Sequence, residues 1–153
     1  MRIKVSEAEG PVLVWLVAKC EDFDTRNNYR VWVTLDNEQI TFDCGADDWE
    51  HAYEQALDAY PDGRPAAVEP LSEYNPLTNW AQGGPILERE HLQPSFQEHG
   101  KYKGLWACNK WVKDRSGATV AISQYGPTLL IAAMRCYVAS KLGDEVEVPK
   151  ELL

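Results

Sequence analysis

The stretch from Pro127 to Leu142 most constrains how this chain can fold. Nearly every residue in it is apolar, and Gly143 directly after it is a typical helix stop. A helix that is apolar on almost all sides must be buried in the centre of a domain or at a subunit interface. We therefore expect a central C-terminal helix around which the chain is built, and homo-oligomerisation stays open.

The rest of the chain shows patterns typical of strands, turns and two further helices, the first of them over Pro11–Glu21. Alternating apolar and polar residues predict two β-hairpins, and the acids near Asp48 can cap a helix that ends near Tyr60. The expected hairpin strands are Tyr29–Leu35 with Gln39–Phe42, and Gly104–Val112 with Ala118–Gln124. Pro, Gly and Asn are frequent between residues 64 and 95, so we expect a long ordered loop there. With 153 residues and no internal repeat, the sequence predicts a single α+β domain over residues 1–153.

Several function classes receive no support from the sequence. No apolar run is long enough to span a membrane, and no signal-peptide hydrophobic region precedes the first charges, so we expect a cytoplasmic protein. The four cysteines form no Cys-x-x-Cys pair and the three histidines are dispersed, so neither a metal site nor a cofactor is expected. No pattern typical of a catalytic nucleophile is present, which favours a non-enzymatic role with no catalytic residues.

The net charge of −9 is concentrated near the N-terminus. Residues 31–63 contain nine acids and no Lys or Arg. This acidic stretch should repel phosphate backbones, so we expect no direct nucleic-acid binding. It could instead attract a basic host protein, and the candidate contact residues are Asp47, Asp48, Glu50 and Glu54. The alternative is a solvated acidic face that keeps the protein soluble.

Arg135 is a charged residue inside the apolar C-terminal helix. A buried guanidinium needs acceptors, ideally a carboxylate bound in two-pronged fashion. Glu88 and Glu90 are the candidates, and an ion pair with Arg135 would fix the preceding loop to the helix. Two alternatives remain, namely that Arg135 faces an anionic ligand such as a phosphate, or that it extends to solvent.

The segment around Gly83-Gly84-Pro85 could form a ligand pocket together with Arg135. Paired glycines allow positive φ and close backbone approach, so their amides could bind an anion, although a tight turn is the alternative reason for them. Trp80 and Tyr125 could stack on a flat ligand, or simply pack. The residues of this candidate pocket are Trp80, Gln82, Gly83, Gly84, Arg89, Tyr125 and Arg135.

Three segments of the chain resemble a known family. They are Pro11–Glu21, Tyr74–His91 with its sequence Trp-Ala-Gln-Gly-Gly-Pro-Ile-Leu-Glu-Arg-Glu, and Tyr125–Leu152 with Tyr-Gly-Pro-Thr-Leu-Leu-Ile-Ala-Ala-Met-Arg-Cys. They are similar to the NinX-like proteins of tailed bacteriophages and prophages, whose loop has Ser-Thr-Asp where this chain has Leu77-Thr78-Asn79. The resemblance implies a phage-encoded accessory protein acting in the cytoplasm of the bacterial host, and it implies no activity.

These observations leave two main functional hypotheses. The first is an accessory protein that binds a small anionic ligand, such as a nucleotide signal of host defence, in the pocket of Trp80 and Arg135. The second is an acidic inhibitor that binds a host protein through residues 31–63. An enzyme that uses Glu88, Glu90 or His91 is a third and less favoured hypothesis.

Overall fold

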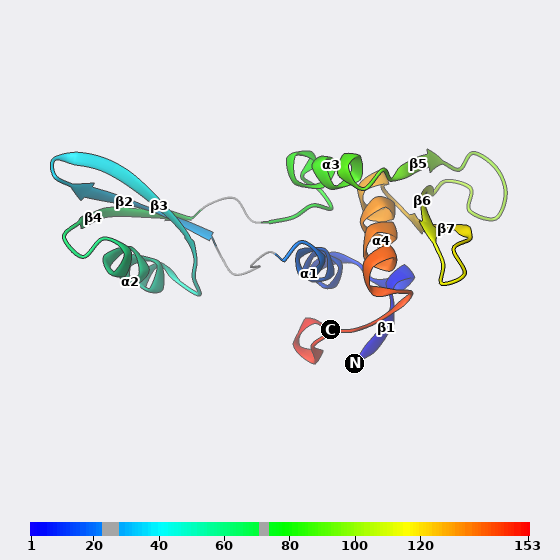
Figure 1. The fold of residues 1–153 in the computed structure, drawn as a ribbon, viewed down its shortest axis with the longest axis horizontal. Helices are drawn as coiled ribbons and strands as arrows, with labels where there is room; N and C mark the ends of the chain where they lie inside the picture. Colours follow the sequence, from blue (N-terminus) through cyan, green and yellow to red (C-terminus); the bar gives the residue numbers. More distant parts are fainter. Residues whose placement is uncertain (23–27, 71–73) are drawn as a thin grey trace. The chain divides into compact units, whose positions relative to one another are not determined.

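A computed structural model describes residues 1–22, 28–70 and 74–153, which fall into two compact units (Figure 1). Unit 1 comprises Met1–Phe23 and Asn75–Leu153, and unit 2 comprises Asp24–Tyr74. Both helices and strands are present, so the predicted α+β class is confirmed. The assignment of residues 1–153 to a single domain stays a prediction. No helix in the described part of the chain is long and apolar enough to cross a membrane.

Unit 1 is organised around one buried helix. Its elements are β1 (Arg2–Lys4), a 3-10 helix (Val5–Glu7), α1 (Gly10–Cys20), α3 (Trp80–Arg89), β5 (Gln93–Phe96), β6 (Trp106–Lys113), β7 (Thr119–Gly126), α4 (Leu129–Leu142), β8 (Glu145–Glu147) and a second 3-10 helix (Lys150–Leu152). The strands β5, β6 and β7 form an antiparallel sheet in that order, and β1 pairs with β8. This β1–β8 pair joins the two ends of the chain.

The buried helix is α4, as the sequence predicts. Thr128 caps it, because its Oγ1 accepts a hydrogen bond from the amide of Ile131 at 3.2 Å, and Gly143 ends it with φ of 89°. Every residue from 132 to 139 is buried. Helices α1 and α3 and the β5-β6-β7 sheet contact α4, so it forms the centre of the unit's core.

Unit 2 is a small sheet covered on one face by a helix (Figure 1). Its elements are β2 (Asn28–Leu35), β3 (Glu38–Gly45), α2 (Trp49–Ala59) and β4 (Arg64–Pro70). The antiparallel order is β3-β2-β4, and the two-residue turn Asp36-Asn37 has positive φ at both positions, as tight hairpins require. The buried apolar core of this unit consists of Val31, Val33, Ala46, Ala52 and Ala56.

Both predicted hairpins are confirmed, but the predicted loop over residues 64–95 is wrong. That range contains β4, α3 and β5. The prediction failed because Pro and Gly disfavour helix and strand only locally, whereas pairing with β2 and packing on α4 supply long-range contacts.

Candidate functional site

The triplet Gly83-Gly84-Pro85 lies inside α3 rather than in a turn. Asn79 caps this helix, because its Oδ1 accepts from the amide of Ala81 at 2.9 Å and its carbonyl accepts from the amide of Gly83 at 2.9 Å. Neither glycine has positive φ. The expectation of a tight turn is therefore wrong, and the two amides do not form the predicted anion-binding nest because they belong to a capped helix.

Gly83 is needed for a close contact between backbones. A Cβ at this position would collide with the carbonyl oxygen of Pro76, and it would lie 2.9 Å from Cδ2 of Leu130 on α4. A Cβ at Gly84 would meet nothing nearer than 3.9 Å, at Trp80. The first glycine lets α3 approach its neighbours, whereas the second has no such role.

The other aromatic and amide residues of the predicted pocket lie in separate surroundings. Trp80 is 56% exposed at the start of α3, and Gln82 accepts through Oε1 from the amide of Asn75 at 2.6 Å. The ring of Tyr125 stacks on Tyr102 with centroids 3.7 Å apart. Each of these side chains therefore already has a partner within the chain or faces solvent.

Arg135 hydrogen-bonds two backbone carbonyls. It is 9% exposed, its Nε donates to the carbonyl of Ala8 at 2.9 Å, and its Nη1 donates to the carbonyl of Tyr125 at 2.7 Å. Burial lowers its pKa, and the charge of Glu9 acts in the opposite direction. Since an arginine keeps its proton at any ordinary pH, Arg135 acts as a charged clamp between the N-terminal segment and the end of β7.

The predicted ion pair of Arg135 with Glu88 and Glu90 is not formed. Glu88 is exposed, and Glu90 binds Lys110 at 3.1 Å and Lys141 at 3.2 Å. Burial would raise the pKa of the Glu90 carboxyl, but the hydrogen bonds from the two lysines outweigh it and the pKa lies below its usual range. The prediction failed because α3 ends beside β6 and the end of α4, away from Arg135.

Arg89 is also engaged within unit 1. Its guanidinium donates to both carboxylate oxygens of Glu21, at 3.1 and 2.8 Å, and the hydroxyl of Tyr137 donates to the same carboxylate at 2.9 Å. Together with Glu90, this network holds the end of α3 against α1, α4 and β6. The segment that the sequence singles out as a pocket is therefore a structural junction in unit 1.

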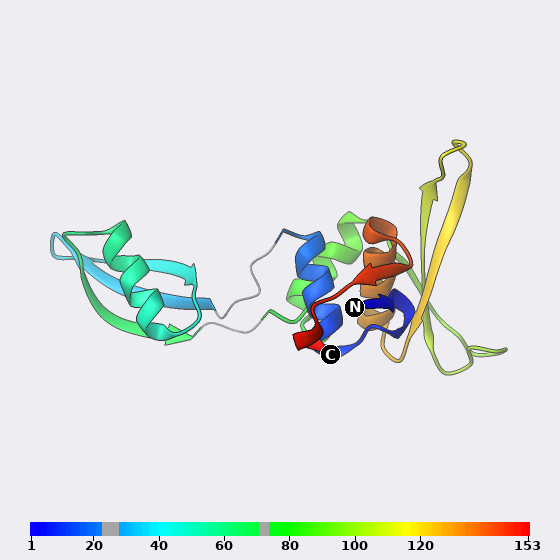
Figure 2. The same ribbon diagram turned by 90° about the horizontal axis from the view of Figure 1, so that it is seen from below.

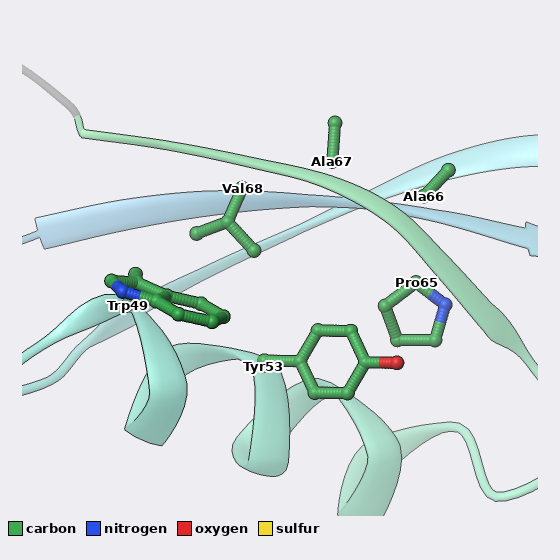
Figure 3. Close-up of a pocket in the computed structure, with 6 residues that line it drawn as sticks. All are labelled: Trp49, Tyr53, Pro65, Ala66, Ala67 and Val68. Atoms are coloured by element: carbon green, nitrogen blue, oxygen red, sulfur yellow. The ribbon is translucent and has the colours of Figure 1, made fainter.

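A groove described by the structure lies in unit 2, between α2 and the edge strand β4 (Figure 3). It has a volume of about 310 Å³, and its lining residues are Trp49, Tyr53, Pro65, Ala66, Ala67 and Val68. Trp49 and Tyr53 are one helical turn apart on α2 and are 58% and 36% exposed. Figure 3 shows both rings facing β4, with Val68 directed at Trp49.

The groove is bordered by acids. Glu50 and Glu54 follow the two aromatic residues by one position on α2 and are exposed. Asp48 caps the helix, accepting from the amide of His51 at 2.9 Å, and Asp47 precedes it at the surface. The four predicted partner-binding acids therefore lie together at the start of α2 and along its exposed side.

Unit 2 carries the whole net charge of the protein. Residues 24–74 contain twelve of the 24 acids and three of the 15 bases, a net charge of −9, and the rest of the chain is balanced at twelve of each. One of those bases is neutralised, because Arg30 binds both carboxylate oxygens of Asp43 at 2.8 Å. That contact holds the pKa of Asp43 below its usual range.

Sequence reasoning missed the groove residues. The spacing of Trp49 and Tyr53 on an amphipathic helix was a detectable signal, since Ala52 and Ala56 already account for its buried face. The part of the groove that β4 lines could not be predicted, because the sequence around Pro65 predicts a loop rather than a strand. In the described part of the chain, no group of three or more His, Cys, Asp or Glu residues could hold a metal ion.

Comparison with known proteins identifies the family of this chain. No curated protein matches the chain. The model of the family described as Bacteriophage P22, NinX, matches residues 4–141, which include all of unit 2, most of unit 1 and all the site residues discussed above. This chain therefore belongs to the bacteriophage P22 NinX family, as the resemblance of its three segments predicts.

Proposed function

We propose that this phage protein is a non-enzymatic accessory protein that acts in the cytoplasm of the bacterial host and binds a host protein through unit 2. The bound segment would be basic and would carry an apolar side chain that enters the groove. One observation carries the proposal: an aromatic-lined groove lies in the unit that holds the entire net negative charge.

The groove and the acids would contribute in different ways. Exposed Trp and Tyr are common anchors of protein interfaces, because they bury a large area at a small cost in side-chain entropy. Trp49 and Tyr53 are available for this in the free protein. The acids beside them would accelerate association with a basic partner and make binding sensitive to salt.

A small anionic ligand is the competing proposal. Two cations predicted for it, Arg89 and Arg135, already donate hydrogen bonds within the chain. An anion approaching the groove would meet Glu50 and Glu54, which repel it. These contacts support the basic protein segment over the nucleotide.

The test measures binding of short labelled peptides to the full chain by fluorescence anisotropy. One peptide is rich in Lys and Arg with a central leucine, a second has alanine in place of that leucine, and a third has Glu in place of the basic residues. We expect the first peptide to bind in a salt-sensitive manner and the third not to bind. The second should bind roughly 10- to 100-fold more weakly than the first, because a buried leucine side chain contributes about 1.5–3 kcal/mol.

Two sets of variants assign the binding to the groove. Trp49→Ala combined with Tyr53→Ala should abolish the preference for leucine over alanine. Trp80→Ala is the matched control, because Trp80 is equally exposed but lies in unit 1. Unchanged leucine preference in the double variant would contradict the proposal.

The second set reverses charge beside the groove. Asp47, Glu50 and Glu54 are changed to Lys, and Asp48 is kept because it caps α2. The matched control reverses three exposed acids of unit 1, namely Glu7, Glu98 and Glu151. Basic-peptide binding should be lost only in the first variant. A panel of nucleotides tested by thermal shift examines the competing proposal of a small anionic ligand, since a ligand at 100 times its Kd adds roughly 2.7 kcal/mol of stability.

A further inference from the structure

We propose that the outer face of the β5-β6-β7 sheet in unit 1 binds single-stranded nucleic acid. The outer face is the side of the sheet away from α4, with the loop of residues 97–105 beside it. The sequence predicts no nucleic-acid binding, on the strength of the acids in residues 31–63. Those acids all belong to unit 2, whereas this sheet belongs to unit 1 and has a local charge of its own.

The pairing register determines which side chains share this face. Cys108 and Gln124 are opposite each other and buried on the side of α4. Because successive residues of a strand alternate between faces, the next pairs along, Asn109 with Ser123 and Trp111 with Ala121, lie on the outer face. Figure 2 shows the far end of the β6–β7 hairpin extending away from the helices of its own unit.

Aromatic rings stand at both ends of the outer face. Trp111 is 58% exposed near the tip of the hairpin, and Tyr125 at the other end stacks on Tyr102 of the loop. Between them, the Ser123 hydroxyl donates to the Asn109 Oδ1 at 2.7 Å. The exposed ring of Trp111 can bind an unpaired base by stacking, which accepts any base because every base has a π-face, and the stacked pair of Tyr102 and Tyr125 borders the other end of the face.

Cations border these rings. Lys101 and Lys103 flank Tyr102, Lys113 lies on the outer face two residues after Trp111, and Arg115 is in the hairpin turn. None of these four forms an ion pair with another residue that the structure describes, and Lys101 Nζ lies over the ring of Tyr102, 5.4 Å from its centroid. Backbone phosphates are the anions that such unpaired cations beside stacking rings would bind.

The opposing charges are few. Residues 93–126 contain five bases and two acids, Glu98 and Asp114. The carboxylate of Asp114 accepts hydrogen bonds from Ser116 and from the amide of Ala118 within the turn, and the Ser116 bonds foremost hold its pKa below the usual range. The fifth base, Lys110, is on the other face and binds Glu90. Four cations therefore remain for phosphate.

The test uses the full chain and labelled oligonucleotides of about 12 nucleotides, within the usual range of such sites. Oligo-dT and oligo-rU distinguish DNA from RNA, and a duplex of the same length and a polyglutamate peptide are the competing ligands. We expect at least one single strand to bind more tightly than the duplex and the peptide. Four phosphate contacts give a salt slope of about −3, so affinity should fall roughly 50-fold between about 50 and 200 mM salt.

Variants with matched controls locate the surface. Trp111→Ala should weaken binding roughly 10-fold or more by removing one stacking ring, whereas Trp80→Ala, at an equally exposed position outside the sheet, should not. Lys113→Ser should reduce the salt slope by roughly 0.7, and Lys150→Ser should leave it unchanged. Absence of binding to both single strands, equal binding of duplex or polyglutamate, or wild-type affinity in Trp111→Ala would each overturn the proposal.

Discussion

Replacing Gly83 and Gly84 of α3 by alanine, one at a time, shows whether the glycine pair serves helix packing or ligand binding. Alanine is favoured over glycine inside a helix by roughly 0.5–1 kcal/mol, so both substitutions gain this amount locally. At Gly84 a Cβ would meet no residue beyond its chain neighbours nearer than Trp80, at 3.9 Å, but the ring of Pro85 directly after it disfavours helical backbone for any residue that has a Cβ. We expect these two effects to offset each other, so that Gly84→Ala changes the stability by less than about 1 kcal/mol.

At Gly83 the same gain is outweighed by overpacking. The new Cβ would collide with the Pro76 carbonyl and approach Leu130 at 2.9 Å. Forcing an extra carbon into a packed site costs about 1–3 kcal/mol, and the upper end applies because a backbone carbonyl cannot rotate away as a side chain can. We expect Gly83→Ala to destabilise by about 2 kcal/mol net.

The two variants differ mainly by the overpacking cost at Gly83. Urea titration of the full chain, followed by far-UV circular dichroism, should separate them by about 2 kcal/mol in the free energy of unfolding. Equal stability of Gly83→Ala and Gly84→Ala would refute the close approach of α3 to Pro76. It would also reopen a ligand-related reason for the glycine pair.

Three further predictions concern single contacts. Arg135→Ala should lower the free energy of unfolding by about 3 kcal/mol or more, because it removes two charge-assisted hydrogen bonds and leaves their carbonyl acceptors unpaired. In the same urea titration, Arg135→Lys should recover part of this loss. Because the pKa of Glu90 is lowered in the folded protein, the stability that its carboxylate contributes is fully present above the unfolded-state pKa of about 4.3 and is lost as the pH falls through the lower folded-state pKa. The stability of Glu90→Gln should therefore differ most from that of the wild type near neutral pH and least in acid. Glu88→Gln, at an exposed position, should match the wild type at every pH. In the urea titration, Asp48→Ala should lose roughly 1 kcal/mol of stability in unit 2 through its missing cap, and Asp47→Ala, which removes a charge but no cap, should not, whereas both should weaken peptide binding.

Local patterns in the sequence were sufficient for the central helix and the two hairpins. Pro127–Leu142 is apolar on almost all sides, so a helix of this sequence would expose apolar groups to water in any orientation on a protein surface. The pattern therefore predicts a buried helix. Asp36-Asn37 predicts a tight turn because these residue types tolerate positive φ. Family membership was likewise predictable from three segments and is confirmed by the match over residues 4–141.

The tertiary structure alone decided what the unusual residues do. Gly-Gly-Pro is helical in α3 because the contacts of that helix with Pro76 and Leu130 outweigh its poor helix propensity. Arg135 binds carbonyls rather than Glu88 or Glu90, because the partners of a buried cation depend on which chain segments packing brings near it. The groove and the outer sheet face likewise depend on tertiary contacts, since the groove needs β4 beside α2 and the outer face needs Tyr102 stacked on Tyr125. Such contacts form through packing across the fold, which no local sequence pattern specifies.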